Sequence, residues 1–292
     1  MEDFSQQPLK GRYPLNIELR PYLRDHFLEG KTIFPAVEIM ITLARAVRER
    51  HRQADLQMIA SAQFNKMLVL DPEAQIQETQ IETVIDDQGV SAKLFTSVAS
   101  KSGSMRRTLE HASLTFVRTA AWPAPSLAFR AAWKLERGCI NVPAVSIYRD
   151  LVPFGLSYQN ITGDLSVSEE GAIAEIYGGG NDADDTLLGS PFVFDAAMHA
   201  ACVWGQRFCN MVAFPVGFDR RMIYTPTKKG ASYTARITPV EVSREPLIFN
   251  AWIFDSDGAI CEEISGLKMR DMTGGRMKPP EWIREGACKK LF

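Results

Sequence analysis

The chain has 292 residues, of which 46% are hydrophobic and 23% charged, so it can bury a large core and is too weakly charged for disorder. Lys and Arg total 33 against 35 Asp and Glu, and this balance does not support nucleic-acid binding. No apolar run reaches the length of a membrane span, and Met1 is followed by polar residues instead of a signal-peptide core. We therefore expect a cytoplasmic globular protein.

The first half of the chain predicts one buried helix followed by strands. Apolar residues recur at helical spacings from about Phe34 to His51. Runs typical of strands follow at 58–70, 75–85, 91–98 and 108–118, with a tight turn at Asp86–Gly89 between two of them. The predicted order is a helix and then an antiparallel meander.

The second half repeats this order. A helix is predicted from Ser190 to about Phe208, and strands near 222–225, 232–238, 247–254 and 259–269, with a turn at Asp255–Gly258. Between the halves, the sequence Ala-Trp-Pro-Ala-Pro at 121–125 breaks regular structure. We predict an N-terminal half at 1–120, a linker at 121–140 and a C-terminal half at 141–292.

A helix and a meander that occur twice favour an α+β double hot dog, in which two antiparallel sheets each wrap around a central helix. An open α+β sandwich is the alternative, because periodicity does not separate the two. The five cysteines are odd in number and lack CxxC spacing, so we expect reduced thiols and no metal site.

Two motifs in opposite halves carry a resemblance. The first is H-x-x-x-G-x-x-x-x-P from His26 to Pro35, and the second is an Asp four residues before a His, Asp195 and His199. Together with Gly155-Leu-Ser-Tyr158 and the closing Ser-Gly-Leu-Lys-Met-Arg at 265–270, they resemble polyketide synthase dehydratase domains over nearly the whole chain.

The resemblance implies a hydro-lyase that eliminates water from a 3-hydroxyacyl thioester carried on the phosphopantetheine of an acyl carrier protein, in polyketide or specialised fatty-acid synthesis. It implies no redox cofactor and no metal. Chain length, stereochemistry and oligomeric state stay open, a homodimer included.

This chemistry needs a base for the proton on the α carbon and an acid for the departing β hydroxide. His26 suits the base, because a neutral imidazole accepts a proton at cytoplasmic pH. Asp195 suits the acid, because its apolar neighbours should keep a proton on the carboxyl group, against the pull of the helix dipole. A histidine at a sheet edge and an aspartate placed for the dipole are the structural alternatives.

Four further residues are assigned to substrate binding. His199 would hold Asp195 or satisfy a buried carbonyl, and Tyr158 would bond the leaving hydroxyl or pack as a core ring. Amides near Ala36, at the open start of the first helix, would polarise the thioester carbonyl. Gly155 belongs to the same site through its motif.

Arg220 and Arg221 would dock an acidic carrier protein, or form a solvated pair. Glu38 opens an alternative, because hot-dog thioesterases place a catalytic carboxylate on the central helix; a glutamate favoured in a first helical turn is the simpler interpretation. Besides the dehydratase and the thioesterase, the third hypothesis is a non-catalytic double hot dog that binds acyl chains.

Overall fold

The computed structural model describes residues 9–99, 106–118, 126–127, 134–135, 138–180, 187–243 and 245–284. The N-terminal half places one helix, α1 (Ala36–Arg50), inside a curved sheet. Its strands are β1 (Leu9–Glu18), β4 (Met58–Phe64), β5 (Ile76–Asp86), β6 (Gly89–Ala99) and β7 (Arg106–Val117). A small hairpin of β2 (Phe27–Leu28) and β3 (Lys31–Thr32) stands before α1.

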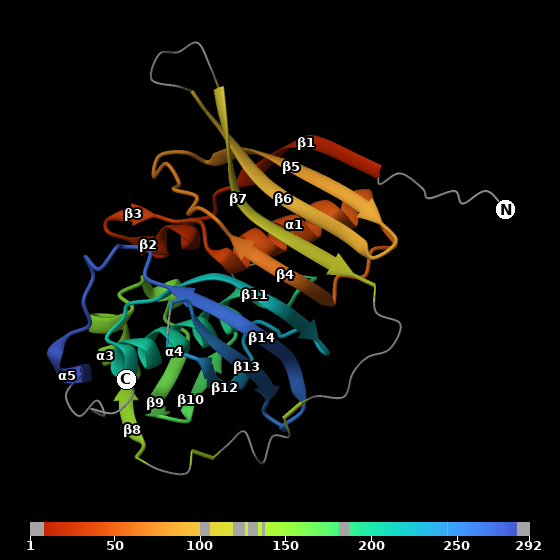
Figure 1. Ribbon diagram of the computed structural model, residues 1–292. Coiled ribbons are helices and arrows are strands. Elements are labelled where there is room, and N and C mark those ends of the chain that lie inside the picture. The colour runs from red at the N-terminus through yellow and green to blue at the C-terminus, as the bar shows by residue number, and fades with distance from the viewer. Residues whose placement is uncertain are drawn as a thin grey trace.

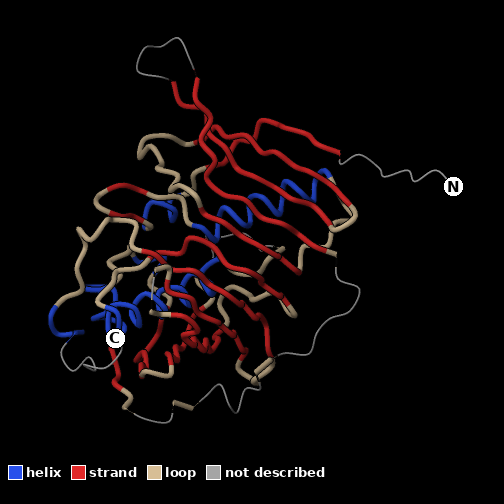
Figure 2. Tube along the Cα trace, viewed as in Figure 1, coloured by secondary structure: helices blue, strands red, loops and turns tan. Residues whose placement is uncertain are grey.

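The C-terminal half has the same plan around a longer helix, α4 (Pro191–Cys209). Its strands are β8 (Ile140–Pro143), β9 (Ile161–Ser168), β10 (Gly171–Tyr177), β11 (Phe214–Ile223), β12 (Ser232–Glu241), β13 (Leu247–Asp255) and β14 (Ile260–Arg270). Short helices α3 (Ala144–Ser146) and α5 (Glu281–Arg284) are also present, together with short helical turns at Pro21–Asp25, Ile147–Leu151 and Leu156–Tyr158. Figure 2 shows the strands of each half curving around a helix.

Among the described residues the strands of both halves form one antiparallel sheet, in the order β1-β5-β6-β7-β4-β11-β14-β13-β12-β10-β9-β8. The halves meet where β4 pairs with β11, with Ala62 opposite Phe218 and Gln63 opposite Gly217. The double hot dog is therefore as predicted, and its two sheets are joined edge to edge.

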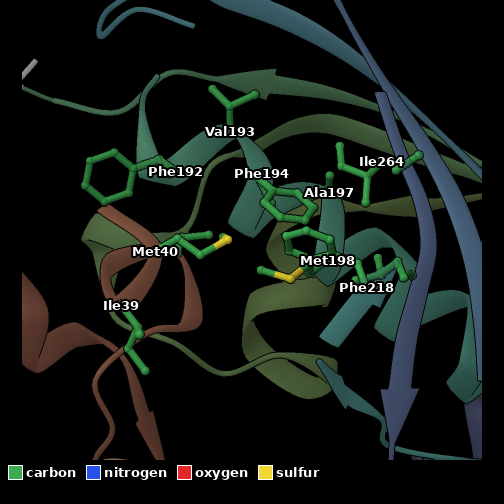
Figure 3. Packing of buried hydrophobic residues seen from close by; sticks show 14 of the residues in the cluster. Ile39, Met40, Phe192, Val193, Phe194, Ala197, Met198, Phe218 and Ile264 are labelled. Carbon is green, nitrogen blue, oxygen red and sulfur yellow. The ribbon is translucent and has the colours of Figure 1, made fainter. Parts of the chain in front are cut away.

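Both helices are buried for a reason that is visible in their sequences. In α1 the apolar positions recur on one side, and Met40, Leu43 and Val47 are fully buried. In α4 nearly every residue up to Gln206 is apolar or small, and the helix is buried all round. Figure 3 shows Met40 of α1 and Phe192 of α4 in the layer of side chains between the two helices.

The predicted helices and hairpin turns are confirmed. The Asp86 carboxylate accepts hydrogen bonds from the amides of Gln88 and Gly89, and Asp255 does the same for Asp257 and Ala259. Strands β1, β8, β9 and β10 were not predicted, β11 begins eight residues before the predicted 222, and the predicted run 58–70 is a strand only to Phe64.

Proline explains part of this difference. Pro14 lies in β1, an edge strand, and Pro215 lies at a register shift of β11. Most of the predicted linker 121–140 lies outside the described residues, so the domain boundaries stay a prediction.

The junction between the halves gives the first testable prediction. Gly217 has a φ of 152°, and a Cβ there would lie 2.2 Å from the Ala62 carbonyl oxygen of β4. Gly217→Ala should therefore lower the free energy of unfolding by roughly 2 kcal/mol or more, measured by urea denaturation. Gly180→Ala is the matched control, because a Cβ at Gly180 meets nothing within 4 Å. Equal stability of the two variants would contradict the prediction.

Candidate active site

A cavity of about 100 Å³ lies between the two halves and collects residues from both. His26, in the turn before β2, and Ala36, at the start of α1, come from the N-terminal half. Asp195 and His199, on α4, come from the C-terminal half. The structure thus brings the predicted base and the predicted acid to one cavity.

His26 is oriented by its backbone neighbours. Its Nδ1 lies 2.9 Å from the carbonyl oxygen of Ile33, which can only accept, so Nδ1 carries the proton. In the neutral ring Nε2 is then unprotonated. Burial lowers the pKa of His26, although Asp195 opposes this shift. The imidazole is thereby kept in the form that accepts a proton.

Aromatic rings fix the plane of this imidazole. The Phe154 ring centroid lies 4.3 Å from that of His26, and the Tyr158 ring meets it edge-on at 5.1 Å. Phe154 also lies 5.2 Å from the His199 ring. It therefore contacts both histidines of the cavity, although it lies just outside the motif that begins at Gly155.

Asp195 and His199 are both about 95% buried, one helical turn apart on α4. His199 Nε2 lies 2.9 Å from Asp195 Oδ2, but the two groups are not aligned for a hydrogen bond, and neither atom has another partner among the described residues. Buried polar atoms are nearly always hydrogen-bonded. Two such atoms at the wall of a cavity can bind the oxygen atoms of a ligand.

The start of α1 offers further donors. Pro35 precedes the helix and provides no side-chain cap, whereas its carbonyl accepts from Ile39. The amides of the first helical turn, beginning with Ala36, therefore have no acceptor within the helix. They lie at the positive end of the helix dipole, beside the cavity that Ala36 lines.

Tyr158 and Gly155 lie behind His26 and are not among the residues that line the cavity. Tyr158 is fully buried, and its hydroxyl has no hydrogen-bond partner among the described residues. The Gly155 amide donates to the Asp25 carbonyl, and a Cβ at Gly155 would lie 2.5 Å from the Asp25 side chain. Gly155 thus serves a close backbone approach in this structure, and its substrate-binding role stays a prediction.

Asp25 holds the loop that contains Gly155 and Ser157 next to His26. Its carboxylate accepts from the amide of Ser157 at 2.9 Å and from the hydroxyl at 2.6 Å. An N-terminal residue thus fixes the C-terminal loop that supports the imidazole through Phe154 and Tyr158. The position of Asp25 next to His26 in the sequence was a signal for this supporting role. Its partner Ser157, 132 residues later, could not be predicted from the sequence.

Arg220 and Arg221 have different environments. Arg221 is 3% exposed, pairs with Glu262 at 2.7 Å, donates to the Leu188 carbonyl and stacks on Phe194. The predicted docking of a carrier protein by Arg221 is therefore wrong, because its guanidinium is enclosed. Arg220 is 41% exposed and 4.0 Å from Glu263.

Glu38 faces a different cavity. Its carboxylate accepts from the Tyr22 hydroxyl at 2.9 Å, and it lines a separate cleft with Arg45 and Pro191. Burial raises its pKa to about 7, although Tyr22 and Arg45 oppose the shift. Because it does not line the cavity of His26, the structure gives no support to a thioesterase centre that combines Glu38 with that cavity.

The comparisons with known proteins agree with this geometry. Residues 146–279 match the family model described as the polyketide synthase dehydratase N-terminal domain. The match covers this part of the chain, which is similar to the polyketide synthase dehydratase family. The resemblance that the motifs predicted is confirmed. No curated protein matches the sequence.

Solved structures share the fold over almost the whole chain. The dehydratase domain of a mycocerosic acid synthase-like polyketide synthase is 15% identical, with a TM-score of 0.71 over 91% of this chain and 93% of that one. The dehydratase domain of PpsC from Mycobacterium tuberculosis, in complex with C12:1-CoA, is 20% identical, with a TM-score of 0.63 over 89% of this chain and 94% of that one. A pyran synthase domain of the sorangicin pathway is also 20% identical, with a TM-score of 0.66 over 93% of this chain and 99% of that one.

These likenesses show the fold, and since one such neighbour is named a pyran synthase, the reaction must be argued from the cavity. In the described part of the chain, no group of three His, Cys, Asp or Glu side chains could hold a metal ion. No helix there is long and apolar enough to cross a membrane.

The buried carboxyl of Glu38 gives a second prediction. Its pKa rises from the usual 4.5 to about 7 on folding, so between these pH values the folded chain keeps a proton that the unfolded chain releases. Stability should therefore fall as pH rises through this window, by up to roughly 3 kcal/mol. Glu38→Gln should remove most of this loss and stabilise the protein at pH ~8 but not at pH ~4.

Thermal unfolding between these pH values measures the effect. Glu49→Gln is the control, on the same helix but exposed. If the wild type and Glu38→Gln lose stability in parallel as pH rises, the shifted group is not Glu38.

Proposed function

We propose that this chain eliminates water from a 3-hydroxyacyl thioester to give an α,β-enoyl thioester. The observation that carries the proposal is the placement of His26 and Asp195, from opposite halves, at one cavity. An elimination needs an acid and a base that reach adjacent carbon atoms of one substrate. A shared cavity between the halves provides that arrangement.

The reaction assigns one step to each group. His26 Nε2 takes the proton from the α carbon, the C–H electrons form the new double bond, and the bond from the β carbon to oxygen breaks. Asp195 donates its proton to the departing hydroxide, which leaves as water. His199 lies against the Asp195 carboxyl at 2.9 Å and positions it.

Negative charge develops on the thioester oxygen as the α proton leaves. The free amides at the start of α1, beside Ala36, are placed to stabilise this oxygen. Tyr158 would act through the His26 ring, which it contacts edge-on. The reaction moves protons and breaks a C–O bond without net oxidation, so the proposal includes no redox cofactor. The acid and the base are both side chains, so the proposal assigns no step to a metal.

The carrier is part of the proposal. Lys66 is exposed and lines the cavity, so a cation stands where the cavity reaches the surface. It would meet the phosphate of a phosphopantetheine arm. Arg220 would contact the acidic surface of an acyl carrier protein. A homodimer stays a prediction, as does a cytoplasmic location.

The proposed dehydratase and the two alternative functions differ in their products. A thioesterase would release a free acid, and a non-catalytic acyl-binding protein would return the thioester unchanged. Incubation with a 3-hydroxyacyl carrier protein, followed by mass spectrometry, separates the three outcomes, because only the dehydratase product loses one water and stays attached.

The catalytic pair gives a third prediction. His26→Ala and Asp195→Asn should each lower kcat by roughly 10²–10⁴-fold, because each removes one proton transfer. Since both groups act in one elimination, the double variant should be little slower than the slower single variant. Activity of the wild type should fall on the acid side below pH 6.5, because burial lowers the pKa of His26.

The measurement is enoyl thioester formation across pH, with thermal unfolding to confirm that each variant is folded. Asp150→Asn is the control, because Asp150 does not line the cavity. Near-normal turnover of Asp195→Asn would remove this carboxyl from the chemistry, and multiplicative losses in the double variant would argue against one shared step.

The carrier surface gives a fourth prediction. Arg220→Glu should raise KM for the carrier-bound substrate and leave KM for the pantetheine thioester nearly unchanged, because only the carrier presents an acidic surface. Arg48→Glu, on the other half, should change neither. An equal rise of KM for both substrates would show that Arg220 serves the cavity or the fold instead.

A further inference from the structure

Tyr148 contacts His199 from outside the cavity. It is 7% exposed and is not among the residues that line the cavity. It belongs to the turn Ile147–Leu151, in which the Val152 amide donates to the Ile147 carbonyl at 2.8 Å. This hydrogen bond spans five residues and makes a π-helical turn, a conformation that is rare and occurs frequently at functional sites. The turn therefore directs attention to the hydroxyl that it carries.

The Tyr148 hydroxyl has an acceptor for its proton in His199. The amide of Ile161, at the start of β9, donates to the hydroxyl oxygen at 2.7 Å. Burial raises the pKa of Tyr148, although the Ile161 amide opposes this shift, so the hydroxyl keeps its proton. His199 Nδ1 lies 3.5 Å from the same oxygen, with the two rings at 80°. Hydrogen bonds in catalytic sites are often long before the substrate binds.

We propose that Tyr148 is a positioning residue that holds His199 in the tautomer with the proton on Nε2, and so leaves the acidic proton of Asp195 for the substrate. The inference rests on the proposed function, in which Asp195 is the acid. A ring nitrogen that accepts a hydrogen bond carries no proton, so in the neutral imidazole the other nitrogen carries it. The Tyr148 hydroxyl at Nδ1 thus makes Nε2 a donor.

The opposite tautomer would weaken the acid. His199 Nε2 lies 2.9 Å from Asp195 Oδ2. Without a proton, Nε2 would accept the carboxyl proton, and the departing hydroxide would compete with it for that proton. With a proton on Nε2, His199 can only donate there, so the acidic proton stays on the carboxyl group. The two histidines of the cavity therefore hold opposite tautomers, because the Ile33 carbonyl keeps the proton of His26 on Nδ1.

The tautomer can be measured without turnover. Heteronuclear NMR of the whole protein, with isotope-labelled histidine, distinguishes a protonated ring nitrogen from an unprotonated one at pH ~8, where an unperturbed imidazole is neutral. The chain has four histidines, and loss of one signal in His199→Gln assigns the signal of His199. We expect the proton on Nε2 of His199 and on Nδ1 of His26. A proton on Nδ1 of His199 in the wild type would overturn the inference.

Tyr148→Phe removes the donor and keeps the ring. It should raise the population of the Nδ1-protonated tautomer of His199 by roughly two- to tenfold, the value of one hydrogen bond, and lower kcat for enoyl formation. KM should change little, because Tyr148 does not line the cavity. Tyr148→Met, which also lacks the hydroxyl and adapts to irregular space, replaces this variant if it does not fold. An unchanged tautomer or an unchanged kcat in the folded variant overturns the inference.

Tyr233→Phe is the matched control. The buried Tyr233 hydroxyl also accepts a backbone amide, from Lys228 at 2.6 Å, but Tyr233 does not line the cavity. This variant should leave the His199 tautomer and kcat unchanged. A glutamine amide donates without a choice of tautomer, so Tyr148→Phe should cost less kcat in a His199→Gln background than in the wild type. An equal cost in both backgrounds would show that Tyr148 acts only through the Ile161 amide and the fold.

Turnover separates this inference from the proposed function. If no 3-hydroxyacyl thioester loses water, the proposed function fails, and NMR still decides which nitrogen of His199 carries the proton. If water is lost and Tyr148→Phe matches the wild type in tautomer and in kcat, the function stands and the inference is overturned.

Discussion

The pairing of β4 with β11 is the constraint on which the candidate active site depends. His26 belongs to one half and Asp195 to the other, and these two strands are where the sheets of the halves are hydrogen-bonded together. On the C-terminal side, Phe218 of β11 packs against Phe194, the residue before Asp195, at 6.0 Å between ring centroids. Phe194 therefore connects the junction between the halves to the residue next to it, Asp195.

The N-terminal side is connected to the same junction through the backbone. The segment after β4 pairs with the residues before α1, since the Phe34 amide donates to the Leu68 carbonyl and Ile33 bridges to Val69. Ile33 also carries the carbonyl that holds His26 Nδ1. A shift at the junction would thus move the base and the acid relative to each other, because each is connected to it by short contacts.

The start of α4 depends on a buried pair of charges. Arg221 and Glu262 are almost completely enclosed, which costs desolvation free energy that only good geometry offsets. The guanidinium bonds the Leu188 carbonyl and lies over the Phe194 ring. We infer that this pair fixes the helix start, and with it the direction in which Asp195 points.

The sequence predicted both helices, the duplication and the two motif residues that meet in the cavity. It failed where burial depends on tertiary contacts. Arg220 and Arg221 were treated alike, although neighbours in a strand point to opposite faces, and this alternation could have separated the exposed arginine from the buried one. Glu38 fits a first helical turn, and nothing local reveals that Tyr22 encloses it.

The duplicated halves differ most at the N-termini of their helices. Pro191 has no amide hydrogen and the Ser190 side chain accepts from the amide of Phe192, so the start of α4 is capped, whereas α1 begins without a side-chain cap. The cleft beside the start of α4 contains the carboxyl of Glu38, but the described residues that line it include no histidine. This cleft therefore lacks the imidazole and the free amides on which the proposed elimination depends. The open helix start, the imidazole and the carboxyl coincide at one of the two related places, and the proposed chemistry is therefore confined to the cavity of His26 and Asp195.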